Sequence, residues 1–326
     1  MSFEEPERIL LHRNSIEKVI KGTIPPPSTI DLEISWDCNH SCVWCVYRES
    51  HKRQFMNVSI VNAVLEYAER NNVPWIVLSG AGEPTLHPEF SAIIASLEAK
   101  ELNYALFTNG SNLSVLEGES LNHCRYLRVS LDAADPNTWL RTHRPTTSEP
   151  SYRSIIGGIR EIVHRRTQTK VGLSFVVNRA NRLEVPEFVA LSASLGVDEV
   201  LIRGDIDDNS LQVHHYQSSW PEPISARVVV RRRGRIGNPS ATKCFAIALK
   251  MVVAPDGSIP LCCLKRDIKS SLGNVNESPI EACWGSSLHR RFLSTISPSE
   301  CSPCRFSEAN SIVEAHLSAN RFTDLL

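Results

Sequence analysis

Cysteine is the residue type in this chain that points most directly to chemistry, because ten of its 326 residues are cysteines and most of them are clustered. Three lie near the start of the chain, with three residues between the first pair and two between the second: Cys38, Cys42 and Cys45. Six more lie toward its end: Cys244, Cys262, Cys263, Cys283, Cys301 and Cys304. In a reducing compartment, clustered cysteines serve more often as metal ligands or catalysts than as disulfides. We therefore expect two metal centres.

The first group, Cys38, Cys42 and Cys45, lies on one tight loop that follows the strand-like residues 30–36. Three thiolates on such a loop can bind three irons of a [4Fe–4S] cluster. The fourth iron then has no protein ligand and can bind an outside molecule through nitrogen and oxygen. The alternative is a structural zinc site. It would take His40 as its fourth ligand, although the position of this histidine between two cysteines makes the loop cramped.

With Trp44 directly before its third cysteine, the loop resembles the cysteine motif of the radical S-adenosylmethionine (radical SAM) superfamily. The resemblance covers about residues 29–205. It implies a partial (β/α)6 TIM-like barrel and a SAM-binding [4Fe–4S] cluster that an external reductase, such as flavodoxin or ferredoxin, reduces. It also implies that the cluster cleaves the sulfonium bond of SAM, and that the resulting 5′-deoxyadenosyl radical abstracts a substrate hydrogen.

The residues after the second strand-like run resemble the Gly-Gly-Glu segment of this superfamily. They include Gly80, Gly82 and Glu83, with Ala81 as a mild departure from the usual pattern. The glycines would let the backbone approach the methionyl end of SAM, and Glu83 would accept a hydrogen bond from its ammonium group. An ordinary turn between a strand and a helix is the alternative interpretation.

Further SAM contacts are expected at the ends of two other strands. Asn109 follows the third strand, and Ser130 lies in the fourth. In similar enzymes this serine touches SAM, and a later arginine pairs with its carboxylate. Arg144 is our candidate for that arginine, with Arg141 close behind, and an exposed salt bridge is the simpler explanation for either one. Trp44 is expected to contribute to adenine binding through its backbone while its ring packs.

Four cysteines of the second group have the spacing C-x17-C, a long gap, then C-x2-C: Cys244, Cys262, Cys301 and Cys304. A hairpin turn signal, Pro255-Asp256-Gly257, lies between the first two. The arrangement resembles the twitch domain, a shortened SPASM-type module of radical SAM enzymes, over about residues 242–305. The resemblance implies one auxiliary [4Fe–4S] cluster, so the chain would hold two clusters. A four-cysteine zinc site is the alternative.

Cys263 remains outside this ligand set, directly beside Cys262. On a short strand, neighbouring side chains point to opposite faces, so its thiol would point away from the cluster. A thiol S–H is weak enough to quench a carbon radical, which makes Cys263 a candidate hydrogen-atom donor. The alternative is a small buried residue, because free cysteine packs like a small hydrophobe. Packing is also the interpretation that we favour for Cys124 and Cys283.

Composition and charge exclude several other classes of protein. The 35 Lys and Arg residues nearly balance the 36 Asp and Glu residues, so we expect no general nucleic-acid partner. No run is long and apolar enough to span a membrane, and the first residues do not resemble a secretory signal. We therefore expect a cytoplasmic protein with no membrane partner.

Strand-like and helix-like segments alternate along the first two thirds of the chain, which predicts an α/β fold with a parallel sheet. The expected strands are residues 30–36, 75–79, 104–108, 127–131, 171–177 and 199–202. The expected helices are residues 58–71, 88–99, 152–166, 185–195 and 307–319, with a weaker one over 112–122. We expect an N-terminal arm (1–28), the barrel (29–205), a connector (206–240), the twitch domain (241–306) and a C-terminal helix and tail (307–326).

The leading functional hypothesis is an enzyme that abstracts a hydrogen atom from a carbohydrate-like small molecule of the aminoglycoside, cyclitol or nucleoside type. Cys263 favours epimerisation of that carbon. The first alternative is a dehydrogenase that oxidises a secondary alcohol, with the auxiliary cluster as electron acceptor. A peptide-modifying enzyme is a further alternative, although we expect the residues before Thr29 to be too few for a leader-binding domain. A non-catalytic electron carrier is the least favoured alternative, because an electron carrier has no use for an iron that is open to an outside ligand.

Overall fold

The computed structural model describes most of the chain, namely residues 6–116, 121–147, 151–166, 168–204, 229–233, 241–266, 268–298, 301, 304 and 306–319. The chain forms two compact units. The sheet unit comprises residues 33–58 and 77–235, and the cysteine-rich unit comprises residues 1–32, 59–76 and 236–326. Within the described ranges, no helix combines the length and the apolar character that crossing a lipid bilayer requires.

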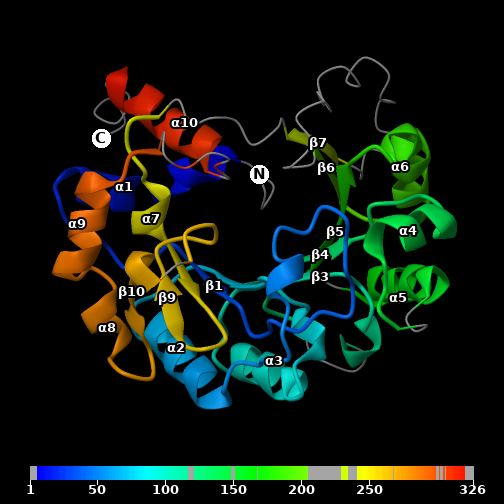
Figure 1. The fold of residues 1–326 in the computed structure, drawn as a ribbon, viewed down its shortest axis with the longest axis horizontal. Helices are drawn as coiled ribbons and strands as arrows, with labels where there is room; N and C mark the ends of the chain where they lie inside the picture. The colour runs from blue at the N-terminus through cyan, green and yellow to red at the C-terminus, as the bar shows by residue number, and fades with distance from the viewer. Residues whose placement is uncertain are drawn as a thin grey trace. The chain divides into compact units, whose positions relative to one another are not determined.

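A parallel sheet forms the centre of the sheet unit (Figure 1). Its strands follow one another in chain order: β2 (Ile76–Leu78, whose last two residues belong to this unit), β3 (Tyr104–Thr108), β4 (Cys124–Ser130), β5 (Lys170–Val177), β6 (Glu199–Gly204) and β7 (Val229–Arg233). Successive pairs from β3 to β7 are parallel. Apart from Lys170, every residue of β5 is buried, as expected where both faces of a parallel sheet are covered.

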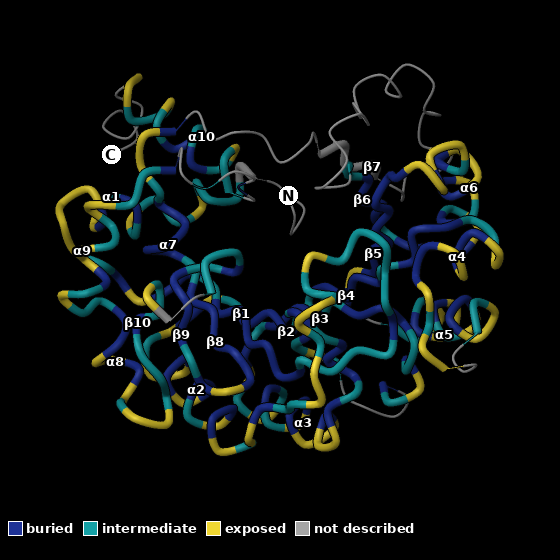
Figure 2. Tube along the Cα trace, viewed as in Figure 1, coloured by how far each residue is buried: buried dark blue, intermediate teal, exposed yellow. Residues whose placement is uncertain are grey.

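Helices cover one face of this sheet: α3 (Phe90–Ala99), α4 (Pro136–His143), α5 (Tyr152–Arg165) and α6 (Val185–Ser194). Phe175 of β5 packs on Phe188 of α6, with ring centroids 4.7 Å apart. Because side chains alternate along a strand, Ser174 faces the other way, and its Oγ lies 3.3 Å from Ser130 Oγ on β4. Figure 2 shows buried strands and helices whose exposed residues lie on their outer sides.

The cysteine-rich unit contains shorter elements. They are the 3-10 helix η1 (Pro6–His12), α1 (Arg13–Ile20), β1 (Thr29–Leu32), α2 (Val58–Arg70), α7 (Ala246–Leu249), β8 (Lys250–Val253), β9 (Ser258–Pro260), β10 (Ser271–Asn274), α8 (Ile280–Cys283), α9 (Ser287–Thr295) and α10 (Ser307–Ser318). β1 and β8 pair in parallel, and β9 and β10 pair antiparallel. The helices α1, α7 and α10 share one apolar cluster that includes Ile16, Leu249 and Val313.

The α/β fold expected from the sequence is confirmed, and all six expected strands are present as β1 to β6. Among the described strands and α-helices of the sheet unit, two were not expected. β7 lies inside the predicted connector, where the run Arg231–Arg233 obscured its strand character, and α4 is short. The weak helix expected over 112–122 is reduced to the 3-10 helix Leu113–Leu116 in the described residues. The rest of the connector lies outside the described part of the chain.

Candidate functional site

The loop that carries the first three cysteines is bound to the C-terminus of α4. The last carbonyl groups of a helix have no partner within the helix and must find one elsewhere. Here Ser41 N lies 3.1 Å from His143 O and 3.0 Å from Arg144 O, and Val43 N donates to Thr142 O at 3.0 Å. The cysteine loop therefore caps α4, and the cap fixes the path of its backbone independently of any sulfur contact.

The glycine segment after β2 holds the same loop from another side. Glu83 N donates to Asp37 O at 2.7 Å, and a Cβ on Gly82 would lie only 2.4 Å from that oxygen. Gly80 has φ +138°, and a Cβ there would lie 2.7 Å from the side chain of Glu33. Both glycines are therefore required by close approaches within the chain itself. Their expected contacts with SAM stay a prediction.

Glu83, whose backbone N–H contacts the cysteine loop, is only 2% exposed. Its Oε1 accepts hydrogen bonds from Thr85 N (3.1 Å), Thr85 Oγ1 (2.7 Å) and Thr108 Oγ1 (2.6 Å). Its Oε2 accepts one from Asn109 N at 2.6 Å. Burial raises the pKa of Glu83, while these hydrogen bonds act to lower it. The carboxylate thus joins the glycine segment to the end of β3, and Oε2 keeps a second acceptor position.

Glu83→Gln is expected to lower SAM affinity roughly ten- to a hundredfold, because it removes the charge that would pair with the methionyl ammonium. The variant should also be less stable than the wild type by about 1–3 kcal/mol. Both carboxylate oxygens of Glu83 accept hydrogen bonds, whereas the NH2 group of glutamine would replace one of these oxygens and leave its buried donor without an acceptor. Calorimetric SAM binding and urea unfolding measure the two effects.

Glu98→Gln provides a matched control for this variant. Glu98 is a mostly buried glutamate that accepts from Tyr104 Oη and His123 N, away from the cysteine loop. The Glu98→Gln variant should be less stable than the wild type but should keep its affinity for SAM. Unchanged SAM binding in Glu83→Gln would remove Glu83 from the cofactor site.

Each sulfur of the cysteine loop has a side-chain nitrogen nearby. Asn109 Nδ2 lies 3.9 Å from Cys38 Sγ, and His143 Nδ1 lies 3.6 Å from Cys42 Sγ. His51 Nε2 lies 3.8 Å from Cys45 Sγ. Sulfur ligands in iron–sulfur proteins commonly accept hydrogen bonds of this kind.

The donor set of this loop fits a [4Fe–4S] cluster. Burial raises the pKa of Cys38 to about 12, and the nearby Cys45 adds to the effect. Burial also raises the pKa of Cys42, with Asp132, Cys38 and Cys45 contributing. The three thiols therefore lie close enough to repel one another as thiolates, a repulsion that bound iron would offset. Soft, half-buried sulfur donors suit iron–sulfur clusters, and Cys38, Cys42 and Cys45 would hold the cluster.

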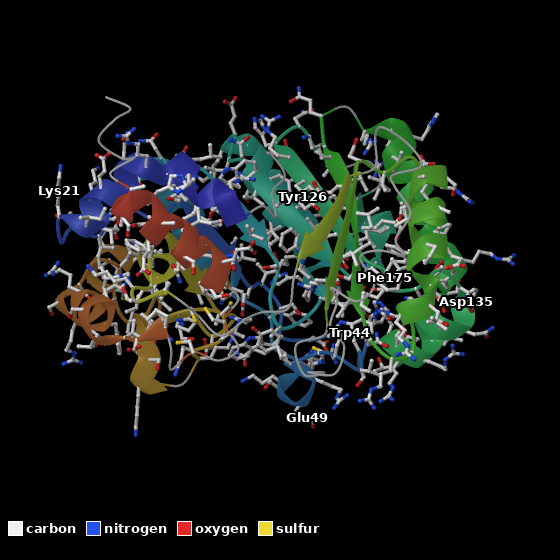
Figure 3. The ribbon with its side chains drawn as sticks, turned by 90° about the horizontal axis from the view of Figure 1, so that it is seen from above. Lys21, Trp44, Glu49, Tyr126, Asp135 and Phe175 are labelled. Atoms are coloured by element: carbon white, nitrogen blue, oxygen red, sulfur yellow. The ribbon has the colours of Figure 1, made fainter. Side chains whose placement is uncertain are left out.

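The other residues expected to bind SAM surround the same loop. Asn109 Nδ2 donates to Asn39 Oδ1 at 2.9 Å. The ring of Trp44, labelled in Figure 3, packs edge-on against His143 with centroids 5.2 Å apart. Arg144 is exposed and has φ +48° at the end of α4, whereas the Arg141 guanidinium donates to Thr138 on its own helix. Of the two arginines, Arg144 is thus the one whose backbone directly contacts the cysteine loop.

A polar and aromatic surface lies on the sheet face that bears Ser130. The Arg128 guanidinium lies 3.7 Å above the Phe107 ring, and Tyr126 Oη donates to Glu199 Oε1 at 3.2 Å. Tyr126 crosses β5 to reach Glu199, and a Cβ on Gly172 would lie 2.5 Å from its hydroxyl oxygen. Gly172 therefore keeps this crossing open. The polar groups of Tyr126, Arg128 and Glu199 are therefore buried within the sheet unit.

The cysteine-rich unit brings together the four cysteines expected as auxiliary ligands. Burial raises the pKa of Cys244 to about 12, with added repulsion from Cys304 and Cys262. Burial likewise raises the pKa of Cys262, with repulsion from Cys301 and Cys304. Four mutually interacting thiols fit a cluster with one cysteine on each iron.

Backbone and side-chain donors surround these sulfurs. Cys262 Sγ accepts from Leu264 N and Lys265 N at 3.4 and 3.3 Å, and Cys304 Sγ accepts from Phe306 N at 3.4 Å. Asn310 Nδ2 lies 3.7 Å from Cys244 Sγ. These contacts suit sulfurs that carry negative charge, as cluster ligands do.

Cys263 is 7% exposed and lies close enough to Cys304 to raise the pKa of that thiol, after burial as the larger cause. The expectation that it lies on a strand is wrong, because β9 ends at Pro260 and residues 261–264 form a bend. The strand rule that pointed its thiol away from Cys262 therefore does not apply. Cys124 and Cys283 are 1% and 3% exposed, as packing residues would be.

Sequence analysis did not single out several residues that the structure places beside the cysteines. His143, His51 and Asn310 approach ligand sulfurs from segments distant in sequence, and Asp132 holds His143. No local pattern marks them, because their positions depend on packing between separate elements. After β5, Asn178 and Asn181 form a turn in which Asn178 N donates to Asn181 Oδ1 at 2.8 Å. The connector residues His214, His215, Tyr216 and Trp220 lie outside the described residues.

Similar solved structures share this fold. SuiB of Streptococcus suis, bound to the precursor peptide SuiA, matches with a TM-score of 0.68 and 14% identity over 94% of this chain and 76% of SuiB. The structure of native anSMEcpe with bound AdoMet matches with a TM-score of 0.64 and 16% identity, over 86% of this chain and 87% of anSMEcpe.

Among curated proteins, a probable GTP 3′,8-cyclase of Saccharolobus islandicus is 29% identical over 180 residues, which are 54% of this chain and 56% of the cyclase. The pre-heme d1 synthase of Dinoroseobacter shibae is 25% identical over 199 residues, covering 58% of this chain and 46% of the synthase. The match thus spans about half of the length of these relatives.

Two family models match the chain itself. The iron–sulfur cluster-binding SPASM domain matches residues 244–305, which contain the second cysteine group. The radical SAM superfamily matches residues 32–208, from the end of β1 to beyond β6. The cofactors are accordingly SAM and [4Fe–4S] clusters, one of them auxiliary. This chain belongs to the radical SAM superfamily and carries a SPASM/twitch domain at its C-terminal end.

Proposed function

We propose that this radical SAM enzyme abstracts a hydrogen atom from a carbon of a carbohydrate-like intermediate of the aminoglycoside, cyclitol or nucleoside type and epimerises that carbon. The observation that carries the reaction is Cys263, a buried thiol beside the auxiliary ligands and outside the four-cysteine set. A polar substrate would suit the polar character of the β4 face that bears Ser130, to which Tyr126 and Arg128 also belong.

In this proposal, SAM and its cluster supply the 5′-deoxyadenosyl radical that takes the hydrogen atom. Cys263 then gives the hydrogen of its S–H bond to the opposite face of the substrate carbon. The sulfur radical left on Cys263 becomes a thiol again by taking one electron and one proton. The electron comes from an external donor such as flavodoxin or ferredoxin, which a cytoplasmic location would supply, so hydrogen atoms and electrons balance over one turnover.

Dehydrogenation of a secondary alcohol is the second candidate. The specific observation in its favour is the auxiliary ligand set, whose four thiols Cys244, Cys262, Cys301 and Cys304 would leave no iron open for substrate. Such a centre suits electron transfer, and it would accept the second electron while a base takes the hydroxyl proton. A nucleotide or a peptide substrate is the remaining alternative, suggested only by the names of the cyclase and of the SuiB complex.

The two reactions differ in the mass and the isotope content of their products. With reductant, SAM and a polar cyclitol or aminoglycoside in deuterated water, an epimerase should give an isomer with one solvent deuterium, because a thiol proton exchanges with solvent. A dehydrogenase should give a product two mass units lighter and no incorporated deuterium. Mass spectrometry of the product and of 5′-deoxyadenosine separates them. Absence of 5′-deoxyadenosine with every polar substrate would contradict the proposed substrate class.

A further inference from the structure

Positive charge is concentrated on the two segments that continue and hold the cysteine loop. Over the whole chain, 35 Lys and Arg residues are balanced by 36 Asp and Glu residues. Residues 46–57, which follow the third cysteine, contain three cations and one acid, Glu49. Residues 136–147, which form α4 and its end, contain two arginines and no acid. We call these five cations the basic rim: Arg48, Lys52, Arg53, Arg141 and Arg144.

Most of the basic rim is open to solvent. Arg48 is partly buried, and its Nε lies 3.2 Å from Glu49 Oε1 in an exposed ion pair. The acid of these two segments is therefore already paired within the chain. The other four cations of the basic rim are exposed, so the surface that they form is positive.

Both halves of the basic rim adjoin residues that would hold the first cluster. Lys52 directly follows His51, whose Nε2 lies 3.8 Å from Cys45 Sγ. On the side of α4, Arg144 O accepts from Ser41 N at 3.0 Å, next to the second cysteine of the loop. A molecule bound to these cations would thus lie beside the cysteine loop.

Two exposed apolar side chains belong to the same segments. Val46 directly follows Cys45 and is 39% exposed, and Leu140 directly precedes Arg141 and is 51% exposed. Protein interfaces combine apolar contacts with a charged margin, and complementary charge steers the partner to its site. A surface of this composition beside the cysteine loop therefore fits an acidic protein.

We propose that the basic rim, together with Val46 and Leu140, is the docking surface for an acidic flavodoxin that reduces the cluster of the cysteine loop. Carboxylates of the flavodoxin would pair with the exposed cations, and the apolar edge of its flavin suits Val46 and Leu140. One electron leaves the reduced flavin and enters the cluster. The inference rests on the external electron donor of the proposed function and is independent of the substrate and of Cys263.

The double variant Lys52→Glu/Arg53→Glu reverses two exposed charges of the rim and should bind flavodoxin about tenfold more weakly at low salt. Wild-type affinity should fall as salt rises, because exposed charges are screened, whereas the variant should depend less on salt. Calorimetric titration of the reconstituted protein with oxidised flavodoxin measures both effects and requires no turnover. Leu140→Ser changes no charge and should weaken binding about threefold, which tests the surface independently if the double variant does not fold.

SAM cleavage without substrate provides a second readout. With reduced flavodoxin as donor, the KM for flavodoxin should rise about tenfold in Lys52→Glu/Arg53→Glu. With dithionite, a small reductant that needs no docking surface, the rate should equal that of the wild type. Arg153→Glu/Arg160→Glu is the matched control, because it makes the same change in net charge at two exposed arginines of α5. This control should bind flavodoxin as the wild type does.

Equal flavodoxin affinity in Lys52→Glu/Arg53→Glu and the wild type would overturn the inference. An equal loss in the α5 control would also overturn it, because net charge alone would then govern binding. Slower SAM cleavage with dithionite would assign the two residues to the fold or to the SAM site. If the wild type binds no flavodoxin but cleaves SAM with dithionite, another donor serves the cluster, and the inference fails while the proposed reaction stands.

Discussion

Replacing Cys38, Cys42 and Cys45 together by alanine is expected to remove about half of the bound iron and to abolish SAM cleavage. The chain has one three-cysteine set and one four-cysteine set, so two [4Fe–4S] clusters and about eight irons should bind per wild-type chain. Without the first set no open iron remains for SAM, while the second set lies in the separate cysteine-rich unit and should stay loaded. Iron analysis after anaerobic reconstitution and chromatography of 5′-deoxyadenosine provide the two readouts.

Cys124→Ala is the matched control for this experiment. Cys124 lies on β4, is 1% exposed and belongs to neither ligand set. The variant should keep all of the iron and all of the SAM cleavage, with some loss of stability from the smaller side chain. Zinc in place of iron at the second set would show that the auxiliary assignment is wrong.

The second large effect is expected for Cys263→Ser. An O–H bond is too strong to give its hydrogen to a carbon radical, so hydrogen abstraction should continue while the inverted product no longer forms. 5′-Deoxyadenosine should still accumulate, and substrate recovered from the reaction should show no inversion. Chiral chromatography of the sugar-like product, together with quantification of 5′-deoxyadenosine, tests this directly.

Cys283→Ser separates the chemistry of the thiol from its packing. Cys283 is also a buried cysteine of the cysteine-rich unit, and its Sγ would lie 2.5 Å from a Cβ on Gly273. Cys283→Ser should therefore change only the local packing, and the variant enzyme should still form the inverted product. A product two mass units lighter, made at full rate by Cys263→Ser, would refute the epimerase proposal in favour of the dehydrogenase.

Much of the fold could be predicted from the sequence because its signals are local. The mainly apolar runs that form β3 and β5, the second of them rich in valine, can be recognised without knowledge of their neighbours. The same holds for the spacing of Cys38, Cys42 and Cys45. α4 was missed although Asp135 and Pro136 form an ordinary helix start, with the Asp135 side chain accepting from Asn137 N and Thr138 N. With only eight residues, the helix lacks the length that makes periodicity visible.

The candidate site was harder to predict, because its geometry depends on segments that meet only in the folded chain. A sequence identifies Gly82 as permissive, but only the structure shows that Asp37 O occupies the space of its missing Cβ. Strand alternation could not predict the direction of the Cys263 thiol, because residues 261–264 form a bend and not a strand. Asp132 and His143 are joined across eleven residues of chain by the packing of α4, which no spacing rule describes.

The cap that Ser41 and Val43 form on the end of α4 has a consequence for what happens to the cysteine loop when oxygen damages its cluster. Oxygen destroys exposed iron–sulfur clusters, whereas these backbone hydrogen bonds involve no sulfur atom and do not require iron. The emptied loop should keep its shape, so damage by oxygen need not unfold the chain or mark it for degradation. We therefore expect that iron and sulfide can rebuild the cluster without refolding of the chain.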